Sequence, residues 1–121
     1  MGIRYKYSTG PVENAIFALT LPGESRTFFA KAVNNGSKTA TVKVVLFALN
    51  GKKRIIRVRS LPVKPGESNL GIFNVGQLLQ FEVVFIVNSA HVLVSGWGKN
   101  EKGRLVSAHR FTQNELHRTI L

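Results

Sequence analysis

The chain has 121 residues and a formal net charge of +11, from 17 basic and six acidic residues. It contains no cysteine, and all six acids are glutamates, which excludes disulfides, zinc–thiolate sites and catalytic triads built on aspartate. The length predicts a single domain spanning residues 1–121, and a hydrophobic content of 44% is typical of a folded domain rather than a disordered tail.

Short segments rich in Phe, Val, Ile and Thr recur along the chain, with turn residues between them. These segments predict strands at 3–7, 15–20, 26–34, 39–48, 53–60, 69–75, 80–88, 91–97 and 104–111. No long segment has a helical period, but Thr112 and Glu115 have capping-box spacing and predict one short C-terminal helical turn. The pattern predicts an all-β protein, a single antiparallel β-sandwich of about seven to nine strands.

The tetrapeptide Pro-Gly-Glu-Ser occurs twice, at 22–25 and at 65–68. Proline favours the first central position of a type II turn, and glycine supplies the positive φ that the second position requires. We therefore expect two type II turns, each leading into a new strand.

The stretch from Arg26 to Val87 carries two turn motifs in a recognisable order. A strand ends in Asn34-Asn35-Gly36-Ser37, and a later strand follows Pro65-Gly66-Glu67-Ser68. This order resembles bacterial immunoglobulin-like β-sandwich modules of the CARDB and fibronectin-like kind, over about half of the chain. The resemblance implies an immunoglobulin-like sandwich with a role in adhesion, binding or assembly and no catalytic residue. Such modules are usually secreted and repeated, whereas this chain shows neither a signal peptide nor a repeat.

A basic segment, residues 52–59, holds five cations in eight positions. Alternation along a strand places Lys53, Arg57 and Arg59 on one side, and we expect Lys43 of the preceding strand to share that side. Like charges across a ladder repel, so one interpretation is a binding site for a polyanion such as nucleic acid or an acidic glycan. The other interpretation is an edge strand that its charges protect against aggregation.

The register of this hairpin decides which side chains share a face. A three-residue loop at 49–51 pairs Val44 with Ile56 and Val42 with Val58, which keeps apolar side chains together. We therefore predict that loop rather than a two-residue Asn-Gly turn.

Trp97 lies between two glycines, Gly96 and Gly98. Small neighbours either leave the indole exposed as a stacking platform or allow it to pack in a tight corner. The sequence leaves both interpretations open, although lone tryptophans are more often buried.

The sequence predicts a protein that is not an enzyme and holds no metal or cofactor. Its three histidines lack metal-ligand spacing, and its glutamates are scattered singly. The favoured hypothesis is an interaction or assembly module that binds a protein partner or forms a homo-oligomer. Three apolar residues on a nominally outer face, Val45, Phe47 and Ile55, suggest a second buried surface. The alternative hypothesis is polyanion binding through the basic face.

The N-terminal residues give no sign of export. Basic residues near the start have no apolar stretch behind them, which does not fit a secretory signal. The longest apolar run, residues 83–87, is far too short to span a bilayer. We therefore expect a cytoplasmic protein with no transmembrane segment.

Overall fold

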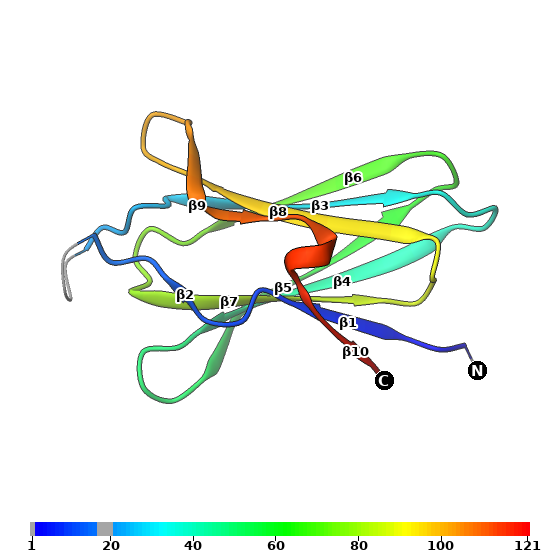
Figure 1. Ribbon diagram of the computed structural model, residues 1–121, viewed down its shortest axis with the longest axis horizontal. Helices are drawn as coiled ribbons and strands as arrows, with labels where there is room; N and C mark the ends of the chain where they lie inside the picture. The colour runs from blue at the N-terminus through cyan, green and yellow to red at the C-terminus, as the bar shows by residue number, and fades with distance from the viewer. Residues whose placement is uncertain (1, 17–20) are drawn as a thin grey trace.

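The computed structural model describes residues 2–16 and 21–121. Its strands are β1 (Tyr5–Ser8), β2 (Val12–Glu13), β3 (Thr27–Asn34), β4 (Ala40–Ala48), β5 (Arg54–Val63), β6 (Ser68–Asn74), β7 (Gln80–Val87), β8 (Val92–Lys99), β9 (Leu105–Phe111) and β10 (His117–Ile120). Sheet A has the order β10-β1-β7-β4-β5, with β2 also paired to β7, and sheet B has the order β6-β3-β8-β9. Sheet B packs above sheet A in Figure 1, which confirms the predicted all-β antiparallel sandwich.

Ten strands are present among the described residues, slightly more than the expected seven to nine. The two that the sequence analysis missed are β2 and β10, which are short and follow no clear alternation. The strand expected at 15–20 lies mostly at 17–20, outside the described residues, and residues 15 and 16 are not in a strand.

The predicted helical turn near the C-terminus is confirmed as η1 (Gln113–Glu115), a 3₁₀ turn. The Thr112 N–H donates to Glu115 Oε1 at 2.8 Å, as a capping box requires. The chain then returns to sheet A as β10, where Ile120 lies opposite Tyr5. None of the described residues belongs to a helix long and apolar enough to cross a membrane.

The core lies between the sheets and is built from the inward-facing positions of both. Phe28 of β3 and Phe81 of β7 are fully buried, and their rings meet edge to face with centroids 5.7 Å apart. Such a pair stabilises the fold beyond the area it buries, by about 1 kcal/mol. Because it joins one strand from each sheet, it fixes how the sheets pack.

Two buried asparagines hold the loops at the ends of the sandwich. The Asn14 Nδ2 group donates to the carbonyl oxygens of Ser25, Val75 and Leu78 at 2.9–3.1 Å, and Asn14 Oδ1 accepts from the Ser25 N–H. Asn34 plays the same role elsewhere, since its Nδ2 donates to two backbone carbonyls and its Oδ1 accepts from a backbone N–H. These side chains form hydrogen bonds with backbone groups of the loops, which have no partner in a β-ladder.

Of the two predicted type II turns, the second is confirmed. Gly66 has φ +75°, and the Glu67 N–H donates to the Lys64 carbonyl at 3.0 Å across the turn. The first prediction is wrong, because Gly23 has no positive φ and follows a cis Leu21–Pro22 peptide. Gly23 lies directly against the Asn14 side chain, and a Cβ there would collide with it.

The predicted register of the β4–β5 hairpin is also wrong. The loop between Ala48 and Arg54 has five residues, Val44 pairs with Arg59, and Val42 pairs with Leu61. The strand continues to Val63, so its buried apolar positions lie at its end rather than in its basic half. The strand was expected to end at residue 60, but it continues through Pro62, because an edge strand accepts proline where the missing N–H faces away from the ladder.

Candidate binding surfaces

The structure does not bring the four predicted basic residues to one face. Lys43 pairs with Ser60 on the outer side of sheet A, whereas Arg57 and Arg59 pair with core-facing residues of β4 on the other side. The expectation that Lys43 shares a side with Arg57 and Arg59 is therefore wrong. Lys53 lies in the preceding loop, and its Nζ is 2.8 Å from Glu82 Oε1.

Glu82 organises a small polar group on the outer side of sheet A. Burial alone raises the pKa of this carboxyl, but hydrogen bonds from Lys53 and Ser8, together with the charge of Lys53, outweigh burial and hold the pKa below its usual value. The Lys53 Nζ also lies 4.3 Å from the centroid of the Phe47 ring. Lys53 is therefore already engaged, with a carboxylate on one side and an aromatic ring on the other.

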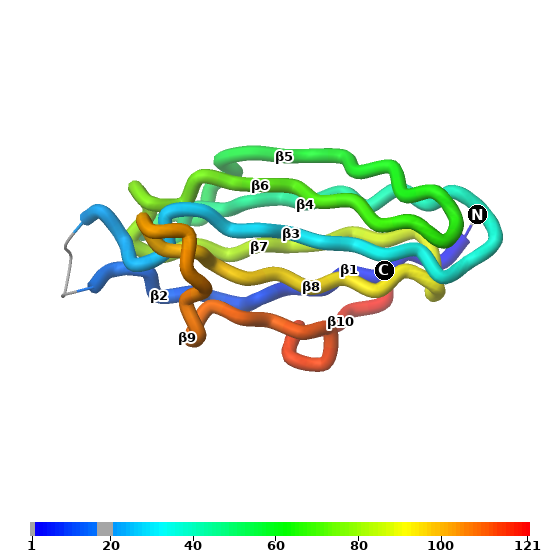
Figure 2. The backbone as a smooth tube through the Cα atoms, turned by 90° about the horizontal axis from the view of Figure 1, so that it is seen from above, coloured from blue at the N-terminus to red at the C-terminus, as the bar shows by residue number. Residues whose placement is uncertain are grey.

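The arginines of β5 form a separate row. Arg54, Arg57 and Arg59 lie opposite Ala48, Leu46 and Val44, so all three point to the core-facing side of sheet A. They remain exposed or half-exposed because β5 lies outside the border of sheet B, as Figure 2 shows along its upper edge. Residues 2–16 and 21–121 contain two ion pairs, Arg26–Glu101 and Lys53–Glu82, and neither involves these arginines.

Trp97 lies on the outer face of sheet B, where its indole is half-buried. It stacks on Phe29 of the neighbouring strand, with an interplanar angle of 4° and centroids 6.1 Å apart. The Lys99 Nζ lies 4.3 Å from the Phe29 centroid. Trp97 therefore packs against its own sheet on one side and keeps part of its ring available on the other.

The flanking glycines have a role that differs from both interpretations left open by the sequence. A Cβ at Gly96 would lie 2.6 Å from the Phe28 ring, and one at Gly98 would collide with the Ser25 hydroxyl. Both contacts are on the inner side of sheet B, opposite the indole. The glycines allow close packing of the core and do not determine the exposure of Trp97.

Around Trp97, the outer face of sheet B carries a set of apolar side chains with a cationic rim, which we call the aromatic face. Its members are Phe29, Leu70, Ile72, Leu93, Trp97 and Leu105, with Lys31, Lys99 and Arg110 among them. Four of the apolar members, Leu70, Ile72, Leu93 and Leu105, are 38–61% exposed. The four strands of this sheet contain no acidic residue.

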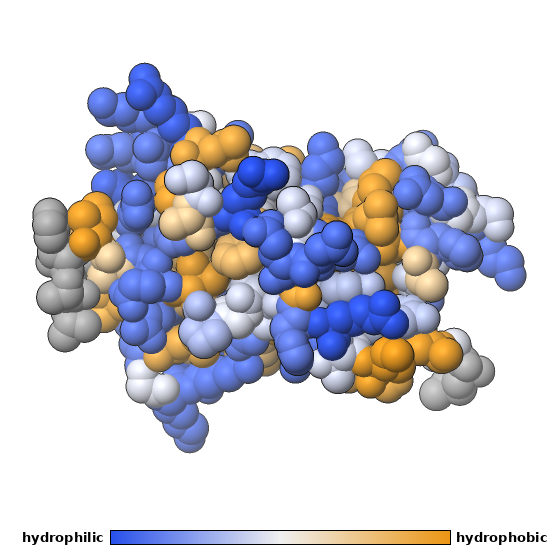
Figure 3. All heavy atoms as spheres, viewed as in Figure 1, coloured by the Kyte–Doolittle hydropathy of each residue, from blue (hydrophilic) through white to orange (hydrophobic). Residues whose placement is uncertain are grey.

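A shallow hollow of about 440 Å³ opens in the aromatic face. Trp97 and Leu105 give it apolar walls, and Lys99 and Arg110 place cations at its margin. By contrast, the side of the molecule shown in Figure 3, where the two sheets are seen edge-on, has hydrophobic side chains in separate groups among hydrophilic ones. A hollow with apolar walls and cations at its rim suits an apolar side chain that has a carboxylate next to it.

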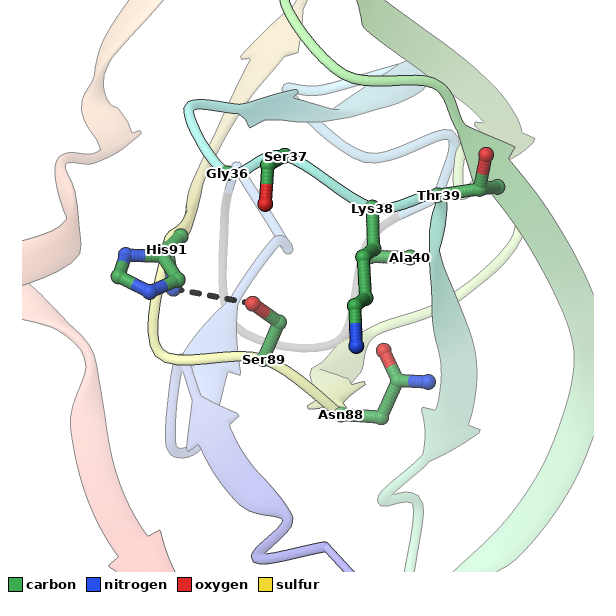
Figure 4. A pocket seen from close by; sticks show the side chains of 8 residues that line it. All are labelled: Gly36, Ser37, Lys38, Thr39, Ala40, Asn88, Ser89 and His91. Carbon is green, nitrogen blue, oxygen red and sulfur yellow. Dashed lines mark hydrogen bonds between the residues drawn. The ribbon is translucent and has the colours of Figure 1, made fainter.

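A second hollow, of about 400 Å³, lies between the β3–β4 and β7–β8 turns (Figure 4). Its lining is polar, with the Lys38 side chain extending towards Asn88 and the Ser89 hydroxyl accepting from the His91 N–H at 3.1 Å. Across the part of the chain that the structure describes, no buried side-chain polar atom lacks a partner. This hollow therefore has no unsatisfied group that calls for a ligand.

A buried serine–histidine pair is present that no sequence motif predicts. Ser25 Oγ lies 2.6 Å from His109 Nδ1, and His109 Nε2 lies 2.8 Å from the Glu13 carbonyl oxygen. The carbonyl can only accept, so Nε2 carries the proton and Nδ1 accepts from the serine hydroxyl. Ser25 is fully buried, and the pair joins the end of β2 in sheet A to β9 in sheet B. No cluster of metal-ligating side chains occurs among the residues described.

The comparisons with known proteins concern the fold alone. No protein-family model and no curated protein matches the chain. Among solved structures, the Thermotoga maritima 1070 protein is similar with a TM-score of 0.56 and 14% identity, covering 95% of this chain and 90% of the other. The Anabaena sensory rhodopsin transducer is similar with a TM-score of 0.51 and 13% identity, covering 85% of this chain and 93% of the other. The chain thus shares its sandwich with both proteins along most of its length.

Proposed function

We propose that this protein is a non-enzymatic interaction module that binds an acidic protein partner through the aromatic face. The single observation that carries the proposal is the half-exposed stack of Trp97 on Phe29 beside a hollow bordered by Lys99 and Arg110. Aromatic side chains on an apolar face, with an arginine beside them, are typical of the residues that dominate protein binding. The resemblance to immunoglobulin-like binding and assembly modules supports the same class of function.

Charge decides between a partner and a second copy. Every ionised side chain on the aromatic face is a cation, because the four strands of sheet B hold no acid. Two copies meeting through this face would oppose like charges, whereas an acidic partner would complement them. The net charge of +11 adds a long-range attraction for the same partner. We therefore rank a homo-oligomer below an acidic partner.

The polyanion alternative ranks lower as well. Its four predicted residues lie on two sides of sheet A, and Lys53 is paired with Glu82. Nucleic acid binding through these residues would need cations on one continuous surface. A catalytic role for the Ser25–His109 pair is not favoured, since the serine is buried and the histidine is held by backbone.

The test uses displayed hexapeptides in which two central positions are randomised between pairs of glutamates. We expect the protein to enrich aromatic and aliphatic residues at the randomised positions, and to enrich nothing from a library flanked by lysines. The double variant Lys99→Glu with Arg110→Glu should lose the enrichment. The matched control, Lys38→Glu with Lys64→Glu, makes the same charge change at exposed positions outside sheet B and should keep it.

Two results would contradict the proposal. One is an equal loss of enrichment in both double variants, which would make the effect a general consequence of net charge. The other is that the wild type enriches no peptide but self-associates, and that the Lys99 and Arg110 substitutions abolish this self-association. That result would assign the aromatic face to a homo-oligomer.

A further inference from the structure

Over most of its length, strand β5 has a neighbouring strand on one side only. One side pairs with β4 along the whole strand, and the other side is the border of sheet A. Residues 54–60 are exposed or half-exposed, whereas Leu61 and Val63 are buried at the end that β6 covers. Figure 2 shows β5 as the outermost strand along this border. An exposed border of this kind is a template for pairing with another extended segment.

The direction of the free backbone groups follows from Pro62. Proline has no N–H, so position 62 does not bond to β4 and its carbonyl points to the free border. There the Pro62 carbonyl accepts from Asn69 Nδ2 at 2.9 Å, which closes this end. Alternation along the strand gives Ser60 and Val58 the same direction. Their N–H and C=O groups are therefore presented to an incoming strand.

The two sides of this free segment differ in chemistry. Arg54, Arg57 and Arg59 lie on the core-facing side, and Ile55 and Val58 lie on the outer side. Ile55 is 60% exposed and Val58 is 43% exposed. A strand paired here would place alternate side chains beside arginines and beside apolar groups.

We propose that β5 binds an extended segment of a partner protein by strand addition, and that this segment alternates acidic and apolar residues. Its acidic side chains complement the arginine row, and its apolar side chains cover Ile55 and Val58. A second copy of β5 does not fit, because antiparallel pairing of the two segments would set arginine against arginine. This site is on sheet A and is independent of the proposed aromatic face.

The test is a titration with a heptapeptide of alternating valine and glutamate, blocked at both ends, followed by amide NMR spectra and hydrogen exchange. We expect shifts confined to residues 54–60 and slower exchange of the Val58 and Ser60 amides. N-methylation of the peptide amides that face β5 should weaken binding at least about tenfold, because it removes ladder donors without changing charge. A peptide of the same composition with its glutamates in one block should bind more weakly than the alternating peptide, by a similar factor.

The protein variants separate this site from charge in general. Arg57→Glu with Arg59→Glu should lower the affinity at least about tenfold, whereas Lys43→Glu with Lys64→Glu makes the same charge change and should leave it nearly unchanged. Variants of the aromatic face should also leave it unchanged. Equal binding of the N-methylated and unmodified peptides would overturn the proposal, and would make the arginine row a general polyanion surface that heparin should also occupy. Absence of binding at millimolar peptide would overturn it as well.

Discussion

Replacing Asn14 by alanine should be among the most destabilising single changes in this protein. The side chain is 1% exposed and satisfies one backbone N–H and three backbone carbonyls, at Ser25, Val75 and Leu78. Alanine removes the partner of the Ser25 N–H and of the Ser25 and Leu78 carbonyls, whereas the Val75 carbonyl still accepts from the Leu78 N–H at 3.0 Å. Each buried group that loses its partner costs about 1–3 kcal/mol. Partial rescue by water would lower the total, so we expect a loss of about 3–4 kcal/mol in the free energy of unfolding.

That loss converts into a large thermal shift. A chain of this length has an unfolding entropy of roughly 0.25 kcal/mol per kelvin, so the melting temperature should fall by about 12–16 °C. The assay is urea and thermal unfolding followed by circular dichroism. Asn69→Ala is the matched control, because Asn69 bonds one carbonyl and one N–H near the surface and should cost under about 1 kcal/mol. An Asn14→Ala variant within 1 kcal/mol of the wild type would refute the idea that this side chain holds the loops together.

Two further predictions concern packing and pH. Gly98→Ala should lower the free energy of unfolding by about 2–3 kcal/mol, because the added Cβ collides with the Ser25 hydroxyl. Gly71→Ala is the control and should be nearly neutral in the same unfolding assay, because its Cβ would meet only contacts of 3.5 Å or more. Similar losses in the two variants would contradict the close packing at Gly98. Glu82→Gln should lower the free energy of unfolding by at most about 1 kcal/mol at neutral pH, because it removes the ion pair with Lys53 that helps to lower the pKa of Glu82. That difference from the wild type should shrink as the pH falls below about 4.3 and through the folded-state pKa, and a constant difference down to pH 2 would contradict the pairing.

The sequence predicted the sandwich because alternation is a strong signal where one side of a strand is buried. The buried phenylalanines and valines of β3, β4 and β7 mark their strands clearly. The turn at Gly66 was predicted correctly, since a positive φ after proline leaves glycine almost the only choice, but the same tetrapeptide at 22–25 does not give Gly23 a positive φ.

The register of β5 was not predictable in the same way. Its basic half is exposed on both sides, so apolar alternation there carries no information about the core. The residues that set the register, Leu61 and Val63, surround a proline that is typical of a turn. The basic set of Lys43, Lys53, Arg57 and Arg59 was inferred from the wrong register, which is why the structure divides it.

The aromatic face was only partly predictable. Trp97 drew attention as a lone tryptophan, but its partner Phe29 looks from the sequence like any strand residue. Two adjacent phenylalanines at 28 and 29 must face opposite sides of a strand, so one of them had to lie outside the core. The absence of acids from all four strands of sheet B was also visible, but it gains meaning only once those strands form one sheet.

The fluorescence of Trp97 offers the most direct test of the proposed partner surface, because this is the only tryptophan in the chain. A peptide with an aromatic residue between glutamates should shift the emission to shorter wavelength and saturate, as the indole loses water on binding. The same titration of the Lys99→Glu variant should show little change. A peptide that binds by calorimetry while leaving the Trp97 emission unchanged would place the binding site elsewhere and contradict the account.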